Sequence, residues 1–293
     1  MESEILVSVI MITYGHEMYI KEAIDGVLMQ ECDFKLELII ANDNSPDNTD
    51  NVVKEIIRSH PRGNSIKYTC HEANIGAQVN FNWAASQATG KYIALCEGDD
   101  YWTDPLKLQK QLDVLENTGA DCCNTLWQQL TNDSKVVDCG YKHEGCDYYI
   151  EEKGNFRYYH TATRIFLKSS LEKVINYFPT ELLLDTPLQI IFSEYYKVIN
   201  LMDYTSVYRI SGTGSWTSIS LRARDRAHID LFHKLSIWIP SKRRNFLRTK
   251  WRLKMQYIKL PKFLIEKGIL VCSKLNHHYM NYRYGHIEFN PNK

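Results

Sequence analysis

The sequence lacks the features of several large classes of protein. It has only 8 prolines and 14 glycines in 293 residues, which excludes a collagen-like or low-complexity chain. No apolar run approaches the roughly 20 residues that a membrane-spanning helix needs. The first four residues, MESE, lack the basic start of a secretory signal, so we expect a cytoplasmic protein. Because 44% of the residues are apolar, the chain can bury the core of one large domain.

Common nucleotide and metal motifs are also absent. Neither GxGxxG nor GxxxxGK[ST] occurs, which argues against a dinucleotide fingerprint and a P-loop. The eight cysteines form no CxxC pair, and reduced thiols are the expectation in a cytosolic protein. Cys139, His143 and Cys146 do not have a standard zinc spacing, so ordinary loop cysteines are favoured over a zinc site.

Acidic residues are scarce near the carboxyl terminus. Residues 241–293 contain 13 lysines and arginines and two acids, a net charge of +11; the whole chain has 35 of each sign, so the remaining 240 residues carry −11. Within 241–262 no acid occurs, and basic residues are interleaved with aromatic and aliphatic ones. This pattern is typical of a helix on an anionic membrane surface, with a solvated helix packed on the rest of the protein as the alternative. No motif indicates a nucleic-acid partner.

Short apolar runs alternate with stretches of helical periodicity over the first 120 residues. Ile5–Thr13 and Leu36–Ala41 are typical of buried strands, and two further strands are predicted at Ile66–Cys70 and Tyr92–Cys96. The helical stretches are 19–28, 46–59, 76–90 and a segment that starts at Pro105. Four strand–helix repeats predict an α/β fold with a doubly wound, mostly parallel sheet.

The pattern is less regular from about residue 121 onward. Tyrosine-rich strands or loops are expected near 148–159. A helix is expected over 185–196, and a strand near Val198–Leu201 follows it. A glycine- and serine-rich loop at 211–215 precedes another predicted helix over 221–237. We therefore expect a main domain over 1–220 and a helical, basic extension over 221–293.

Polar residues follow three of the predicted strands directly. They are Thr13-Tyr14, Asn42–Ser45 and Glu97–Asp100. In doubly wound sheets ligands bind beyond the carboxyl ends of the strands, so these clusters predict one ligand site. Three carboxylates in one turn suit Mg²⁺ or Mn²⁺, which bind oxygen ligands together with substrate phosphates. The alternative is a solvated acidic turn that caps the helix beginning at Pro105.

Four segments carry recognisable motifs: Val7–Tyr14, an opening strand; Asn42–Thr49, similar to DDGSxDxT; Asn74-Ile75-Gly76 with Asn80; and Gly90–Trp102, close to GxYIAxLDxDDxW. In this order they resemble family 2 glycosyltransferases with the GT-A fold, of the kind that build bacterial surface polysaccharides. The resemblance is dense over 5–117 and thinner to about 217. It implies a nucleotide-sugar half over 1–117 and an acceptor half over 118–220.

The resemblance implies roles for the matching residues. Thr13 and Asp43 would hold the base of the donor, and Asp99 would ligate Mn²⁺ or Mg²⁺. Glu97 stands where the family has the first Asp of its DxD, near the ribose or the metal. The donor-binding residues that it implies are Thr13, Tyr14, Asp43, Asn74, Gly76, Glu97, Gly98, Arg209 and Trp216.

The acceptor half is expected to supply the catalytic base. Asp185, at the start of a predicted helix, matches the family's position for this base, although a plain N-cap is the alternative. His160 and Trp102 are expected on the acceptor side, with a structural role as the alternative for His160. Tyr208–Trp216 resembles the family's YRxHxGGxWS loop, in which Ser211 here replaces the histidine.

The resemblance thus implies an inverting, metal-dependent hexosyl- or N-acetylhexosaminyl-transferase. Its donor would be a nucleotide-diphosphate sugar, with a UDP-sugar favoured by the family, and its acceptor a hydroxyl of a glycan or lipid-linked acceptor. The basic segment 241–262 would place the protein on the inner face of the membrane. Two alternatives stay open: a non-catalytic, sugar-nucleotide-binding relative that acts as a scaffold, and a nucleotidyltransferase, which would normally carry a glycine-rich basic loop near the first strand.

Overall fold

The computed structural model describes residues 5–131, 133–152, 157–180, 183 and 185–210, together with positions 220, 223, 226, 227, 230, 231, 234 and 235. The loop at 211–215, the basic segment 241–262 and most of the predicted extension over 221–293 lie outside these residues.

The four strands predicted in the first half are all present and parallel to one another. They are β1 (Ile5–Thr13), β2 (Lys35–Asn42), β3 (Ile66–Cys70) and β4 (Tyr92–Leu95), in the spatial order β3-β2-β1-β4. Nearly every side chain of β2 is buried, as expected for a strand covered on both faces. The predicted boundaries agree with the structure within one residue at each end.

The second half continues the same sheet but mixes strand directions. Its strands are β5 (Tyr101–Trp102), β6 (Cys122–Leu130), β7 (Val136–Cys139), β8 (Tyr148–Ile150), β9 (Ile165–Leu167) and β10 (Val198–Arg209). The full order is β3-β2-β1-β4-β9-β6-β10-β5, with β7 beside β6 and β8 beside β10. β9 is antiparallel to both β4 and β6, whereas β6 and β10 are parallel. The sheet is therefore mostly parallel, as predicted.

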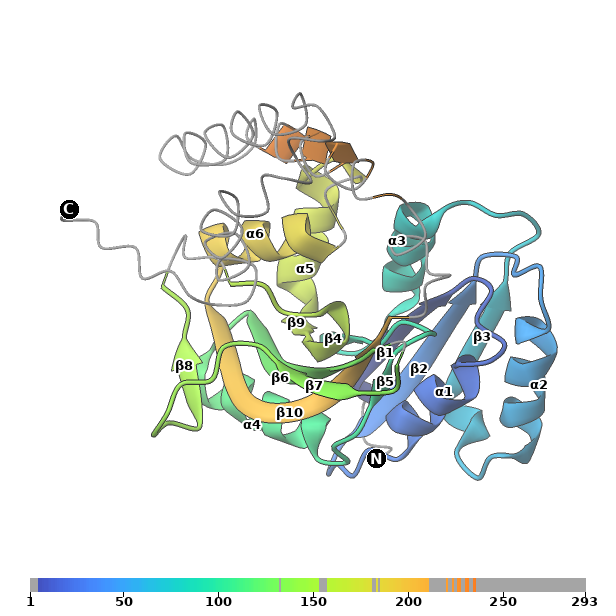
Figure 1. Cartoon of the computed structure of the whole chain (residues 1–293), viewed down its shortest axis with the longest axis horizontal. Helices are drawn as coiled ribbons and strands as arrows, with labels where there is room; N and C mark the ends of the chain where they lie inside the picture. The colour runs from blue at the N-terminus through green and yellow to red at the C-terminus, as the bar shows by residue number, and fades with distance from the viewer. Residues whose placement is uncertain are drawn as a thin grey trace.

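Helices cover both faces of this sheet. α1 (Ile20–Leu28), α2 (Thr49–Ser59) and α4 (Lys107–Thr118) contribute to one apolar core. α3 (Ala77–Gln87), α5 (Lys168–Tyr177) and α6 (Asp185–Tyr195) contribute to the other, and Figure 1 shows these three helices over the same face. Two short 3₁₀ helices, η1 (Gly63–Ser65) and η2 (Thr161–Thr163), connect elements. Two cores, one on each side of a sheet, are the doubly wound arrangement that the sequence predicts.

The structure corrects two helix starts and one strand length. α2 begins at Thr49 rather than Pro46, because the Asp47 carboxylate accepts hydrogen bonds from the backbone N–H (3.1 Å) and the hydroxyl (2.6 Å) of Thr49 and holds a turn there. α4 begins at Lys107, after a turn in which the Lys107 N–H bonds the Asp104 carbonyl. β10 runs to Arg209 rather than ending at Leu201.

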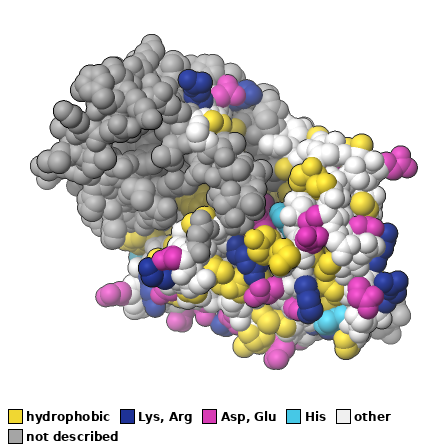
Figure 2. All heavy atoms as spheres, turned by 45° about the vertical axis from the view of Figure 1, so that its right-hand side comes forward, with side chains coloured by type: hydrophobic (Ala, Val, Ile, Leu, Met, Phe, Trp, Pro, Cys, Tyr) yellow, Lys and Arg dark blue, Asp and Glu magenta, His cyan; other side chains and the backbone are white. Residues whose placement is uncertain are grey.

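The described surface carries both signs of charge. On the face drawn in Figure 2, lysine and arginine side chains are interspersed with aspartate and glutamate side chains. Several of these groups form exposed pairs on single helices, such as Lys21 with Asp25 and Lys54 with Asp50. Among the helices that the structure describes, none is both long and apolar enough to cross a membrane.

Candidate active site

The loops after β1, β2 and β4 meet at one edge of the sheet. The Asp43 N–H donates to the Thr13 carbonyl at 2.9 Å, and the Gly98 N–H donates to the Ile12 carbonyl at 3.1 Å. Parallel pairing of β1 with both neighbours places the ends of these strands side by side. The three polar clusters expected from the sequence are therefore one cluster in space, at the carboxyl ends of the strands.

Asp43 is fixed by the start of α3. Its Oδ1 accepts the Ile75 N–H at 2.7 Å and its Oδ2 accepts the Gly76 N–H at 3.0 Å. The Asn74 side chain donates to the Asp43 carbonyl at 3.3 Å, so three of the predicted donor-binding residues do come together. Asn44 has φ = 58°, a left-handed conformation that Asn adopts more readily than most residues. Asn44 thus meets the backbone requirement that the glycine of the DDGS-like segment would otherwise meet.

Gly98 lets the loop after β4 pack closely against the loop after β1. A Cβ at this position would lie 2.7 Å from Thr13 Oγ1 and 2.9 Å from His16 Nδ1, closer than side-chain carbons pack. His16 Nδ1 is 3.1 Å from Thr13 Oγ1, and its Nε2 is 3.8 Å from Asp99 Oδ2. Tyr14, in contrast, is half exposed.

His16 is a site residue that the sequence reasoning missed. Its imidazole lies between Thr13, a predicted donor contact, and Asp99, the predicted metal ligand. The available signal was its position in the loop Thr13–His16, which directly follows a strand of the parallel sheet.

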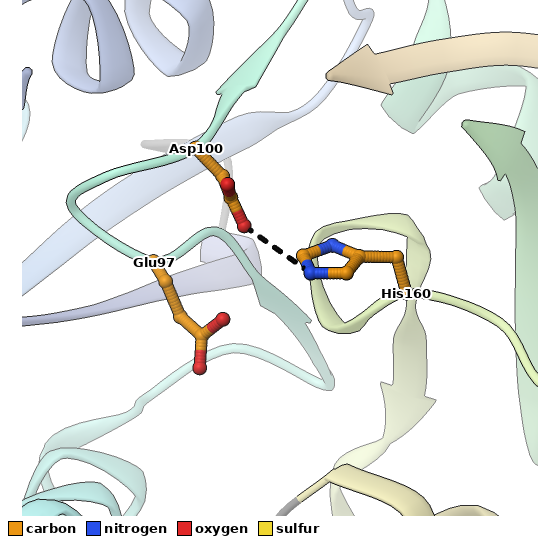
Figure 3. A group of neighbouring side chains, drawn as sticks. All are labelled: Glu97, Asp100 and His160. Atoms are coloured by element: carbon orange, nitrogen blue, oxygen red, sulfur yellow. Dashed lines mark ion pairs between the residues drawn. The ribbon is translucent and has the colours of Figure 1, made fainter. Parts of the chain in front are cut away.

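Glu97, Asp100 and His160 bring three potential metal-ligand side chains together among the residues that the structure describes. Their potential ligand atoms all lie within 4.8 Å of one another. Figure 3 shows the Asp100 carboxylate and the His160 ring facing each other, with 3.5 Å between Asp100 Oδ2 and His160 Nε2. Asp100 and His160 are 1% and 5% exposed. The predicted ligand Asp99 is outside this group, and its role as a ligand stays a prediction.

Burial sets the protonation of this group. It raises the pKa of Asp100 well above its usual range, an effect that the neighbouring Asp99 and Glu97 charges increase and Arg209 opposes. Burial, together with the nearby Arg164 cation, lowers the pKa of His160 to about 3, so its imidazole is neutral at pH 7. Crowded carboxylates beside a neutral imidazole are an environment in which a divalent cation is electrostatically favourable. The donor set is compatible with Mn²⁺ or Mg²⁺.

Cys139, His143 and Cys146 do not make a second group of this kind within the described ranges. His143 Nε2 is 2.8 Å from the Arg157 guanidinium, and the Cys146 thiol donates to the His143 carbonyl at 3.8 Å. Cys139 is the last residue of β7, and Cys146 is exposed in the loop that follows.

Arg209 fastens the end of β10 to the carboxylate loop. Its guanidinium pairs with Glu22, donates to the Asp99 carbonyl at 2.9 Å and lies 4.3 Å from the centre of the Tyr101 ring. Its backbone N–H donates to Asp100 Oδ1 at 3.0 Å. These contacts hold the loop in place, while the predicted contact of Arg209 with donor phosphate stays a prediction.

Trp102 is placed differently from the expectation. Its ring is 2% exposed, its indole N–H donates to the Ala162 carbonyl at 2.8 Å, and the Lys107 ammonium lies 5.0 Å from the ring centre. Trp102 therefore supports η2 from within the core and does not present its ring to an acceptor. The sequence misplaced it because its neighbour Asp100 belongs to the site, whereas the chain turns into β5 immediately afterwards.

Asp185 is the first residue of α6, at the helix start that the sequence predicts. Gln189, one turn further along, binds the backbone of Tyr159: the Tyr159 N–H donates to Gln189 Oε1 at 3.3 Å, and Gln189 Nε2 donates to the Tyr159 carbonyl. The segment that carries His160 is thus tied to the helix that begins with Asp185. Trp216 and Ser211 lie outside the described residues.

The structure is an α/β fold with its polar site at the carboxyl ends of parallel strands. Comparison with known proteins identifies the family. Residues 8–175 match the family described as Glycosyl transferase family 2. This segment is more than half of the chain, so the protein belongs to glycosyl transferase family 2.

Two sequence relatives illustrate the extent of the similarity. The chain is 45% identical to the uncharacterized protein Rv1520 of Mycobacterium tuberculosis over 109 residues. This aligned segment is 37% of this chain and 31% of Rv1520. It is 32% identical over 133 residues to the putative teichuronic acid biosynthesis glycosyltransferase TuaG of Bacillus subtilis, which covers 45% of this chain and 51% of TuaG. The match therefore spans about a third to a half of the length of these relatives.

Solved structures share the fold over most of the chain. Residues 1–349 of S. aureus TarS, solved in complex with UDP-GlcNAc, superpose with a TM-score of 0.64 at 17% identity, covering 92% of this chain and 80% of that one. The mannosyltransferase PcManGT from Pyrobaculum calidifontis, solved with GDP-Man and Mn²⁺, gives 0.63 at 18% identity, covering 96% and 85%. The predicted GT-A fold is confirmed.

Proposed function

We propose that this protein transfers a sugar from a nucleotide-diphosphate donor, a UDP-sugar by preference, to a hydroxyl group of a glycan or lipid-linked acceptor in the synthesis of a surface polysaccharide. The observation that carries the proposal is the convergence of Thr13, Asp43 and the Glu97–Asp100 loop at adjacent strand ends. The similarity to TuaG, a putative teichuronic acid biosynthesis glycosyltransferase, and to TarS, solved with UDP-GlcNAc, supports this substrate class.

The loops after β1 and β2 hold the nucleotide in this proposal. Thr13 and Asp43 bind the base, and the turn formed by Asn74 and Gly76 lines the same side. The Asp43 carboxylate already accepts two backbone N–H groups, which fixes its orientation before a ligand arrives. Such fixed orientation reduces the entropy that binding costs. Tyr14, half exposed beside Thr13, adds a ring face for the donor.

Glu97 and Asp99 hold Mn²⁺ or Mg²⁺ in this proposal. The bound ion would neutralise negative charge that develops on the departing nucleotide diphosphate. Gly98 between them keeps the loop against Thr13 and His16, where a larger residue would force the two loops apart. The carboxylates therefore stay beside the residues that bind the nucleotide.

Asp185 acts as the general base in the acceptor half. It takes the proton from the acceptor hydroxyl while that oxygen attacks the anomeric carbon. The new carbon–oxygen bond forms as the bond from the anomeric carbon to the diphosphate oxygen breaks, so the sugar is transferred with inversion and no covalent enzyme intermediate is formed. In this proposal Glu97 and Asp99 hold the ion that would stabilise the leaving group, and Asp185 removes the proton from the nucleophile.

Turnover separates an enzyme from a non-catalytic scaffold. Purified protein is incubated with UDP-sugars, Mn²⁺ and a lipid-extracted acceptor fraction, and UDP release and the anomeric configuration of the product are measured by NMR. An enzyme releases UDP and gives the inverted anomer, and Asp99→Asn abolishes both. The matched control Asp25→Asn, on the exposed face of α1, keeps full activity. Nucleotide binding without turnover under every acceptor condition would favour the scaffold.

The basic segment 241–262 is proposed to bring the protein to the inner, cytoplasmic face of the membrane. Its cations and interleaved aromatic residues are the chemistry that binds anionic lipid headgroups. Full-length protein is expected to sediment with vesicles containing phosphatidylglycerol and to remain free with purely zwitterionic vesicles. Replacement of the arginines and lysines in 241–262 by glutamine should abolish sedimentation; unchanged sedimentation would contradict the proposal.

A further inference from the structure

The group of Glu97, Asp100 and His160 contains more ligand atoms than the proposed metal site uses. All three side chains lie within 4.8 Å of one another, so proximity alone would make Asp100 and His160 ligands as readily as Glu97. The contacts of Asp100 and His160 show that the polar atoms of these two residues already serve the protein.

His160 has its proton on the nitrogen that faces Asp100. Its Nδ1 accepts the Ala162 N–H at 3.4 Å and caps η2. Because an accepting nitrogen carries no proton, the neutral ring carries it on Nε2, 3.5 Å from Asp100 Oδ2. A metal-binding histidine normally donates its other N–H to an acceptor, whereas here that nitrogen faces a donor. Stacking on the Tyr208 ring, with 4.3 Å between ring centres, holds the plane of the imidazole.

Asp100 also has both carboxylate oxygens directed at protein donors. Oδ1 accepts the Arg209 N–H at 3.0 Å, and Oδ2 faces the Nε2–H of His160. Its 1% exposure leaves little surface at which an ion could approach. Glu97 and Asp99 precede it in the same turn, and the Asp100 N–H closes that turn on the Glu97 carbonyl at 3.1 Å.

The Arg209 hydrogen bond and the 3.5 Å contact with His160 join three parts of the chain that are far apart in sequence. Asp100 belongs to the loop between β4 and β5, His160 precedes η2, and Arg209 ends β10. The Asp100 carboxylate faces one donor from the His160 segment and one from the end of β10. These two contacts fix the position of the Glu97–Asp99 turn relative to the acceptor half. Removing either donor would leave a buried carboxylate oxygen unpaired.

We propose that Asp100 and His160 are a positioning pair, not metal ligands: His160 donates to Asp100, Asp100 anchors the turn, and the ion is left to Glu97 and Asp99. This inference rests on the proposed function, because it divides roles within the proposed metal site. It predicts that the imidazole of His160 never enters the coordination sphere of a bound ion.

Pulsed electron paramagnetic resonance of Mn²⁺ bound to the full chain, with and without UDP, tests this directly. A directly coordinated imidazole gives a characteristic ¹⁴N coupling. We expect either no such coupling or one that survives in His160→Gln and disappears in His16→Gln, since His16 is the other imidazole near Asp99. A ¹⁴N coupling that is present in the wild type and lost only in His160→Gln would overturn the proposal.

Two substitutions at His160 provide a second readout. The glutamine amide can donate to Asp100 much as Nε2–H does, whereas leucine fills space without donating. His160→Gln should keep the Mn²⁺ dissociation constant within about threefold, and His160→Leu should weaken it about tenfold, as expected for a supporting residue. Equal losses in both variants would contradict the positioning role. Failure of the wild type to bind Mn²⁺ under any condition would instead reject the metal site of the proposed function.

Discussion

The two halves of the sheet place their polar side chains differently. In the first half, β1, β2 and β4 are apolar along their middles, and the site residues follow their carboxyl ends. In the second half, β6 and β10 carry buried polar pairs along their length: Asn124 Nδ2 donates to Asn200 Oδ1 at 2.8 Å, and the hydroxyls of Thr125 and Thr205 are 2.6 Å apart. The first half is stabilised chiefly by apolar burial, whereas the second also depends on matched hydrogen bonds.

The buried acid of the first half, Glu37, also lies near the end of a strand. Glu37, near the amino end of β2, accepts hydrogen bonds from Ser8 Oγ at 2.5 Å and from the Thr89 N–H at 2.7 Å, and pairs with Lys67 at 2.5 Å. It lies at the end of the strands opposite to the site. The first half thus keeps polar groups at strand ends, where one end supports the fold and the other binds substrate.

The largest expected effect is a loss of catalytic rate that leaves nucleotide binding unchanged. If the first half binds the donor and the second half supplies the base, Asp185→Asn should lower kcat by about 10³-fold and leave the dissociation constant for UDP unchanged. Steady-state kinetics and calorimetry measure the two quantities. Asp113→Asn, an exposed position on α4, is the control and should alter neither. A strong loss of UDP affinity in Asp185→Asn would break the division between the halves.

The buried acid at the amino ends tests the stability of the first half. Glu37→Ala should reduce the free energy of unfolding by about 3 kcal/mol, because several donors lose their acceptor. Although burial opposes it, hydrogen bonds from Lys67, Ser8 and Thr89 lower the pKa of Glu37. Its contribution is therefore present above the pKa of the unfolded state and disappears as the pH falls through the folded value.

Denaturant unfolding at several pH values measures this effect. The control is Glu55→Ala, which breaks an exposed pair with Arg58 on α2 and should cost less than about 1 kcal/mol. Similar losses in the two variants would show that the Glu37 network contributes little to the first half.

The polar ladder of the second half should behave cooperatively. Asn200→Ala removes the partner of Asn124 and also the donor to Glu151 Oε2 at 3.0 Å, and should cost about 2 kcal/mol. In a double-mutant cycle, Asn124→Ala and Asn200→Ala should be coupled by about 1 kcal/mol. Additive losses in denaturant unfolding would mean that the Asn124–Asn200 pair adds no coupling of its own between β6 and β10.

Lys107 of α4 contacts the second half of the protein through Thr163. The protonation of its buried ammonium group gives a further test of what stabilises the contact between the two halves. Its ammonium is fully buried and donates to the Thr163 carbonyl at 3.0 Å and to Gln111 Oε1 at 2.6 Å. Burial lowers its pKa to about 7, so above that pH the unfolded chain binds one proton more than the folded protein. Stability should therefore rise with pH from about 7 toward the pKa of the unfolded lysine, by up to about 1.4 kcal/mol per pH unit.

Lys107→Met should remove this slope while filling the same space. Chemical unfolding between about pH 7.5 and pH 9.5 measures it. Lys110→Met is the control, because Lys110 pairs with Asp104 and Asp203 near the surface and its pKa is raised. A slope that persists in Lys107→Met would assign the pH dependence to another group.

The same contrast explains which elements the sequence predicts. The strands β1, β2 and β4 are mostly apolar runs, and a buried strand in a parallel sheet has that pattern, whereas the edge strand β3 is only partly buried. β6 was not predicted and β10 was predicted at a third of its 12 residues, because Asn124, Thr125, Asn200 and Thr205 interrupt the apolar pattern. Their partners lie about 80 residues away along the chain, so no local pattern reveals that they are paired.

The candidate site was predictable where its residues follow strands. Thr13, Asp43, Asn74, Gly76 and the Glu97–Asp100 loop come together as expected. The sequence could not reveal that Asp100 is held by His160 and Arg209, since these contacts join segments 60 and more residues apart. Nor could it distinguish the buried Trp102 from a residue that lines the site, because the motif Gly90–Trp102 contains both kinds.

The most direct test of the central claim is calorimetric titration with UDP, GDP and dTDP, each with and without Mn²⁺, on the wild type and on Asp99→Asn. The claim is that the carboxyl ends of β1, β2 and β4 form a metal-assisted site for the donor nucleotide. It predicts tight binding of one nucleotide, most favourably UDP, that requires Mn²⁺ and is lost in Asp99→Asn. Binding of none of the three nucleotides, or binding that is indifferent to both Mn²⁺ and Asp99, would contradict it.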